Sequence, residues 1–156
     1  MKIVITSGAA EGPTALAAFD EALRTAGVEN YNLIPLSSII PANSIIERAR
    51  FVTPLDEYGH RLYVVMARCD TDMIGTAAWA GVGWTQEEET GRGLFVELHA
   101  ACKHEVDEAI EATLVSMMAS RQRVYLPIQS EVSGIVCRGK PVCAVVIAVY
   151  QSEGWN

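Results

Sequence analysis

Apolar residues along the chain recur at two spacings, and one of these spacings predicts β-strands. Residues 2–6 form a short run rich in β-branched side chains, as expected for a buried strand. Residues 61–69 are apolar at successive positions, which indicates a strand buried on both faces. The full set of expected strands covers residues 2–6, 31–36, 61–69, 77–84, 92–99, 124–128 and 141–150.

The second spacing predicts two helices. Apolar residues recur at helical intervals from Leu16 to Ala26, between Pro13, which suits a first helical turn, and Gly27, which suits a helix end. A longer amphipathic pattern covers residues 101–121, where the methionines are expected to fill the core. Residues 7–12 are small and are expected to form a loop, and residues 41–60 an irregular segment.

The order of these elements favours the α+β class. Strands neighbour strands along the chain and two helices are inserted between them, unlike the regular alternation of a βαβ sheet. No repeat, low-complexity segment or linker interrupts the pattern, so residues 1–156 are predicted to form a single domain.

Composition and the absence of known motifs argue against several classes of partner and site. The net charge is −7, with 12 basic and 19 acidic residues, so no nucleic-acid partner is expected. No apolar stretch is long enough to cross a bilayer, and no membrane partner is expected. The four cysteines are scattered, which is typical of reduced thiols in a cytoplasmic protein and does not favour a metal site. The sequence contains no phosphate-binding loop, dinucleotide fingerprint or serine-hydrolase elbow.

Three places along the chain, with four residues between them, remain as candidates for chemistry, and each also has an ordinary structural explanation. Ser37 and Ser38 follow an expected strand, where a serine pair usually forms a turn. Glu97 interrupts an apolar strand; a carboxyl group shielded from water there could act as a proton donor, whereas on an open face it would simply be solvated. Asp20 borders the apolar face of the first helix, where it is either exposed or able to hold a guanidinium group.

The residues around these candidates resemble the pyruvoyl-dependent arginine decarboxylases. Residues 27–41, in which Asn-Leu-Ile at 32–34 leads into Leu-Ser-Ser-Ile-Ile-Pro at 36–41, are similar to the family's self-cleavage segment. The resemblance extends to residues 7–12 (Ser-Gly-Ala-Ala-Glu-Gly), 18–20 (Ala-Phe-Asp) and 93–97 (Gly-Leu-Phe-Val-Glu), and it is strongest over residues 3–41 and 91–121. Two departures are Ala42, where many relatives have a second proline, and residues 42–60, which match poorly.

The resemblance implies that the chain cleaves itself between Ser37 and Ser38. The products would be a β chain of residues 1–37 and an α chain of residues 38–156, whose first residue would become a covalent pyruvoyl group derived from Ser38. Asn32 would assist near the scissile bond. The substrate amine would form a Schiff base with the pyruvoyl ketone, which accepts the electrons released as CO2 leaves.

The resemblance further implies roles for the two acidic residues and an assembly. Glu97 would protonate the former α-carbon, and Asp20 would bind the guanidinium group of arginine, so that L-arginine is converted to agmatine and CO2. The expected fold is an αββα-type sandwich of mixed and antiparallel sheets with flanking helices. The expected assembly is a homotrimer of cleaved units, or a dimer of trimers, with sites at subunit interfaces.

Two alternatives stay open at this stage. One is a pyruvoyl decarboxylase of another amino acid, or a relative that cleaves without being active. The other is an uncleaved, non-enzymatic oligomeric α+β module, in which Ser37 and Ser38 form an ordinary turn and Glu97 is solvated.

Overall fold

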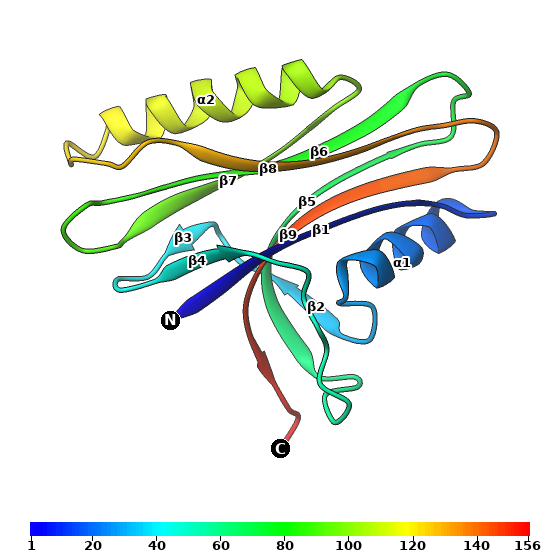
Figure 1. Ribbon diagram of the computed structural model, residues 1–156, viewed down its shortest axis with the longest axis horizontal. Coiled ribbons are helices and arrows are strands. Elements are labelled where there is room, and N and C mark those ends of the chain that lie inside the picture. The colour runs from blue at the N-terminus through cyan, green and yellow to red at the C-terminus, as the bar shows by residue number, and fades with distance from the viewer.

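A computed structural model describes residues 1–156 as two β-sheets packed face to face, with one helix on each outer side (Figure 1). The predicted α+β class and the αββα sandwich are therefore confirmed. The strands are β1 (Lys2–Glu11), β2 (Asn32–Pro35), β3 (Ile39–Ile40), β4 (Ile45–Arg48), β5 (Arg61–Thr71), β6 (Ala77–Gln86), β7 (Gly93–Ala100), β8 (Gln129–Val136) and β9 (Val142–Glu153). The helices are α1 (Ala15–Ala26) and α2 (Lys103–Ala119).

The five-stranded sheet has the order β2-β5-β9-β1-β4 and mixed pairing. β9 runs antiparallel to both β1 and β5, whereas β2 pairs with β5 and β4 pairs with β1 in parallel. The two central partners, β5 and β9, are long and almost continuously apolar because α1 covers one face and the second sheet covers the other.

The four-stranded sheet has the order β3-β7-β6-β8 and is antiparallel throughout. Its outer face is covered by α2, which buries Val106, Ile110 and Leu114 against the sheet. Glycines in β6 allow this close approach: a Cβ atom at Gly83 would lie 2.2 Å from Cγ2 of Ile110. Between the two sheets lies a core that includes Phe95, Ile40 and Tyr150.

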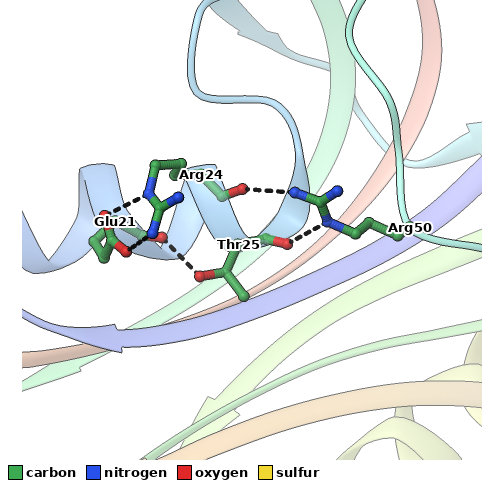
Figure 2. A network of polar contacts seen from close by, with 4 residues as sticks. All are labelled: Glu21, Arg24, Thr25 and Arg50. Carbon is green, nitrogen blue, oxygen red and sulfur yellow. Dashed lines mark hydrogen bonds and ion pairs between the residues drawn. The ribbon is translucent and has the colours of Figure 1, made fainter.

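Helix α1 has well-defined ends. The Thr14 hydroxyl accepts a hydrogen bond from the Ala17 N–H at 3.1 Å, and Gly27 closes the helix with a φ of 86°. Figure 2 shows Arg50 donating to the carbonyl oxygens of Thr25 and Arg24, at 3.2 and 3.5 Å, and Arg24 pairing with Glu21. A guanidinium group at this end satisfies carbonyls that have no partner within the helix.

Three expectations about local structure were wrong. Residues 7–12 are not a loop, because β1 continues to Glu11; its small residues are needed where α1 lies close, and a Cβ atom at Gly8 would be 2.1 Å from the Ala22 carbonyl oxygen. Residues 124–128 form only an isolated bridge at Tyr125, and the real strand, β8, follows them as a half-buried edge strand. The segment of residues 41–60 contains the short edge strand β4.

The four cysteines are free, with Cys137 and Cys143 buried, Cys69 half-buried and Cys102 exposed. Neither of the two helices is long and apolar enough to cross a membrane. No group of three or more His, Cys, Asp or Glu side chains lies in an arrangement that could hold a metal ion.

Candidate active site

The Ser37–Ser38 peptide lies where the chain passes from one sheet to the other. On one side, β2 belongs to the five-stranded sheet, and the Leu36 N–H donates to the Val64 carbonyl oxygen at 2.8 Å. On the other side, β3 belongs to the four-stranded sheet, and the Phe95 N–H donates to the Ser38 carbonyl oxygen at 2.9 Å. The peptide between the two serines is therefore held at both ends by different sheets.

The backbone of Ser38 adopts a left-handed conformation with a φ of 67°. For a residue with a Cβ atom this conformation costs about 1–2 kcal/mol, and it persists only where the surroundings enforce it. The two sheet contacts on either side supply that constraint. Strain of this kind is frequently located at functional sites, and here it falls on the residue that the sequence had identified.

The side chain of Ser38 meets Glu97. The Ser38 hydroxyl donates a hydrogen bond to Glu97 Oε1 at 2.5 Å, across 59 positions of sequence. Both side chains are half-buried. A short hydrogen bond to a carboxylate is charge-assisted, and it places an acceptor where it can take the hydroxyl proton. Two residues singled out separately in the sequence thus form one unit.

The strand β7 places Glu97 on the inner face of the sandwich. Phe95, two residues earlier, lies in the core between the sheets, whereas Leu94 and Val96 face α2. Glu97 is paired with Val82 of β6, which also belongs to the inner core. The alternation expected from the sequence therefore holds, and the Glu97 face is the one turned toward the second sheet.

Tyr150 is a further polar group at this place, and the sequence reasoning missed it. Its hydroxyl donates to the Ile39 carbonyl oxygen at 2.8 Å, and the side chain is 9% exposed. Burial, and next the negative charge of Glu97, raise the pKa of Tyr150 well above its ordinary value, so the hydroxyl stays protonated. The sequence feature that could have identified Tyr150 is its position at the end of an apolar strand. A tyrosine buried there usually has a hydrogen-bond partner for its hydroxyl group.

Asn32 lies at the far end of β2 from the serine pair. Its side-chain amide donates to the Gly59 carbonyl oxygen at 2.8 Å, and its backbone N–H donates to the His60 carbonyl oxygen at 2.8 Å. The indole N–H of Trp155 donates to the same Gly59 oxygen, also at 2.8 Å. Extended chain rises about 3.3 Å per residue, so roughly 13 Å separate Asn32 from Leu36. Within one chain Asn32 and Ser38 are not brought together.

Asp20 is also apart from the serine pair. It is exposed on α1, which covers the outer face of the five-stranded sheet (Figure 1). Ser38 and Glu97, in contrast, lie on the inner side of the other sheet. A single chain therefore unites Ser38 with Glu97 and leaves Asp20 and Asn32 elsewhere on the molecule.

Comparison with known proteins identifies relatives along the whole chain. The model of the pyruvoyl-dependent arginine decarboxylase family matches residues 2–154. A pyruvoyl-dependent arginine decarboxylase of Halobacterium salinarum is 34% identical over 153 residues, which cover 96% of this chain and 93% of that protein. One from Pyrococcus abyssi is 32% identical over 149 residues, covering 95% and 93%.

A shorter match of higher identity is found with the pyruvoyl-dependent arginine decarboxylase of Methanothermobacter thermautotrophicus, which is 63% identical over 46 residues, 30% of each chain. Together with the match to the family model, these similarities establish what the sequence resemblance had indicated. The chain belongs to the pyruvoyl-dependent arginine decarboxylase family.

Proposed function

We propose that this chain cleaves itself between Ser37 and Ser38, and that the resulting protein decarboxylates L-arginine to agmatine. The observation that supports cleavage best is the 2.5 Å hydrogen bond from the Ser38 hydroxyl to Glu97, made by a serine held in a strained conformation. A serine hydroxyl is a weak nucleophile until a neighbouring base accepts its proton, and Glu97 is in position to do so.

The first step would convert a peptide bond into an ester. Ser38 Oγ attacks the Ser37 carbonyl carbon while Glu97 accepts the hydroxyl proton. The new O–C bond forms, the C–N bond between the two serines breaks, and the nitrogen of Ser38 receives the proton. The left-handed backbone of Ser38 favours this exchange, because the strain is released when the peptide is cut.

The second step would eliminate the ester. Glu97, having passed its first proton to the Ser38 nitrogen, would accept the Ser38 Cα proton; the Cα–Cβ double bond then forms, the Cβ–Oγ bond breaks, and Ser37 leaves as a carboxylate. During this step negative charge develops on the Ser38 carbonyl oxygen, to which the Phe95 N–H already donates at 2.9 Å. Water then adds to the resulting dehydroalanine and ammonia departs, which leaves a pyruvoyl group at position 38.

The surroundings of Ser38 fit such a group. Its planar former α-carbon would no longer carry the Cβ strain that a φ of 67° imposes on serine. The Phe95 N–H would hold its amide oxygen, and Glu97 would lie beside it. When present, the pyruvoyl group supplies an electron-accepting carbonyl, the property that amino-acid decarboxylation requires of a cofactor.

The remaining roles follow from the positions of the acidic residues. Glu97, beside residue 38, would deliver a proton to the substrate's α-carbon after CO2 leaves. Asp20, with a free and exposed carboxylate, would bind the guanidinium group of arginine through a charge-assisted contact. Because Asp20 and Asn32 do not reach Ser38 within one chain, we propose that a neighbouring copy supplies them, in a homotrimer or a dimer of trimers.

Intact-mass measurement tests the cleavage directly. The purified chain should yield two masses, for residues 1–37 and residues 38–156, the larger one blocked at its N-terminus by the pyruvoyl group. Ser38→Ala should give a single full-length mass, whereas Ser37→Ala is the matched control and should still be cut, because Ser37 contributes only its carbonyl group. An uncut unsubstituted chain would reject the proposal in favour of a non-enzymatic module. Release of CO2 and agmatine from arginine tests the activity.

A further inference from the structure

The hydroxyl of Tyr150 connects the two sheets at the residue that follows the serine pair. Tyr150 belongs to β9 of the five-stranded sheet, and the Ile39 carbonyl that it holds belongs to β3 of the other sheet. Strand β3 is two residues long and lies at the sheet edge, with only β7 as a partner. The Ile39 carbonyl faces away from β7, toward the unpaired edge of the sheet, and the Tyr150 hydroxyl donates to this free acceptor.

The position of the hydroxyl is fixed by packing. The Tyr150 ring lies edge-to-face against Phe95, with 6.2 Å between ring centroids and an angle of 64°. Phe95 in turn donates its backbone N–H to the Ser38 carbonyl oxygen. Two successive carbonyl groups, those of Ser38 and Ile39, are thus held by two residues that also pack against each other.

This contact becomes more important when the chain is cut. Before cleavage, residue 38 is tethered on its N-terminal side through Leu36, which is bonded to β5. After cleavage that tether no longer exists, and residue 38 is a chain end attached to a two-residue strand. The contacts that then orient it are the pairing of β3 with β7 and the hydroxyl of Tyr150.

We propose that Tyr150 is a positioning residue, which holds the Ser38–Ile39 unit so that atoms of residue 38 stay aligned with Glu97 during cleavage and afterwards. This inference rests on the proposed self-cleavage. Tyr150 touches neither scissile atom and acts through the Ile39 carbonyl. Its buried hydroxyl stays a neutral donor even beside a carboxylate, which suits a role that requires donation and no proton transfer.

The decisive variant is Tyr150→Phe, which removes the hydroxyl and keeps the ring. Precursor made by cell-free synthesis is followed by intact mass after translation is stopped. We expect conversion to slow about tenfold, a factor equivalent to about 1.4 kcal/mol. In the fraction that matures, kcat for arginine should fall while KM stays nearly unchanged, because alignment at residue 38 is impaired and substrate binding is not.

Tyr63→Phe is the matched control, since Tyr63 is a half-buried tyrosine on the neighbouring strand β5 whose hydroxyl donates to Glu153 at 2.6 Å. It should mature at the unsubstituted rate. If the unsubstituted chain does not mature, the proposed function fails. If it matures and Tyr150→Phe matures equally fast, only the positioning role is overturned.

A second measurement separates positioning from general stability. In uncleavable Ser38→Ala protein labelled with 13C at isoleucine carbonyls, the shift of the Ile39 signal between H2O and D2O should become smaller in Tyr150→Phe, because the contribution of the tyrosine hydroxyl is lost and only that of the Ile40 N–H stays. The melting temperature should change by only a few degrees. An Ile39 shift that does not become smaller, or a Tyr150→Phe chain that does not fold, would make Tyr150 an ordinary core residue and overturn the proposal.

Discussion

The inner face of the four-stranded sheet brings candidate site residues into contact with one another, whereas the outer side of the five-stranded sheet carries an isolated one. On the inner face, a set of two hydrogen bonds lies at one stretch of backbone: Ser38 donates to Glu97, and Tyr150 donates to the Ile39 carbonyl oxygen. On the outer side, Asp20 on α1 is exposed and does not contact that set. Under the proposed function, one chain supplies the nucleophile and its base for cleavage, whereas Asn32 and Asp20 would come from a neighbouring copy. The predictions below test this division.

The largest effect is expected at Glu97. Glu97→Gln keeps the size of the side chain but removes the base that faces the Ser38 hydroxyl, so conversion of the precursor should slow about a hundredfold or more. The rate is measured by intact mass over time. Glu131→Gln is the control. Glu131 of β8 pairs with Val82 of β6, as Glu97 does from β7, so both carboxylates lie on the same face of the sheet. Glu131 contacts Arg48 at 3.4 Å. Equal rates for both variants would contradict the role of Glu97 in cleavage.

A smaller and different effect is expected at Asp20. Asp20→Asn should leave cleavage unchanged and raise the KM for arginine about tenfold, since a charge-assisted contact to the guanidinium group is lost. Steady-state kinetics of the matured protein measure this change. Glu21→Gln is the neighbouring control, because Glu21 already pairs with Arg24 (Figure 2). An unchanged KM for Asp20→Asn would remove Asp20 from the substrate site.

Mixed assemblies test whether the two regions meet between chains. Under the proposed function, an Asp20→Asn chain would still form the pyruvoyl group, and a Ser38→Ala chain would retain Asp20. Co-expression of the two should restore a fraction of the activity at low arginine concentration, when one subunit completes the site of the next. The measurement is agmatine formation by co-expressed protein against the same proteins mixed at the moment of assay. Activity no higher than that of Asp20→Asn alone would place Asp20 and Ser38 in the same subunit's site.

The smallest effect is expected far from both regions. Thr14→Ala removes the side-chain oxygen that caps α1 and should lower the free energy of unfolding by about 1 kcal/mol. Denaturant unfolding in the Ser38→Ala background measures this loss. Cleavage in the otherwise unsubstituted chain should proceed at its normal rate. A cleavage defect would mean that the strained peptide is sensitive to the stability of the whole five-stranded sheet.

Much of the architecture could be predicted because hydrophobic spacing is a local property. Helix α1 was located from Pro13 and Gly27, and it begins and ends within two residues of them. The small residues of β1 were misread because their size reflects the approach of α1, which no local pattern reveals. Strand β8 was missed because an edge strand that is only half-buried has a weak alternation of apolar and polar residues.

For the candidate site, the sequence singled out Ser38 and Glu97 as separate candidates but did not predict that they touch. The face of Glu97 follows from alternation along β7, whereas its contact with Ser38 depends on how β3 pairs with β7, 59 positions away. Asn32 shows that closeness in sequence is not closeness in space. It lies only six positions before Ser38, but the extended strand β2 places it at the opposite end from the serine pair. For Tyr150 the sequence offers only a polar atom at the end of an apolar strand, and its partner, the Ile39 carbonyl, follows from the stacking of the two sheets.

The place of β1 determines what kind of molecule a cut chain would be. Residues 1–37 include β1, an inner strand that pairs with β9 on one side and with β4 on the other, together with α1 and β2. This fragment cannot dissociate without breaking the hydrogen bonds of β1 to both neighbouring strands. Once unfolded, however, this fragment and residues 38–156 would be separate molecules that must meet again by diffusion. Refolding of the matured protein should therefore depend on protein concentration, even for one subunit alone. Maturation would thus turn a protein that folds as one chain into a two-component complex.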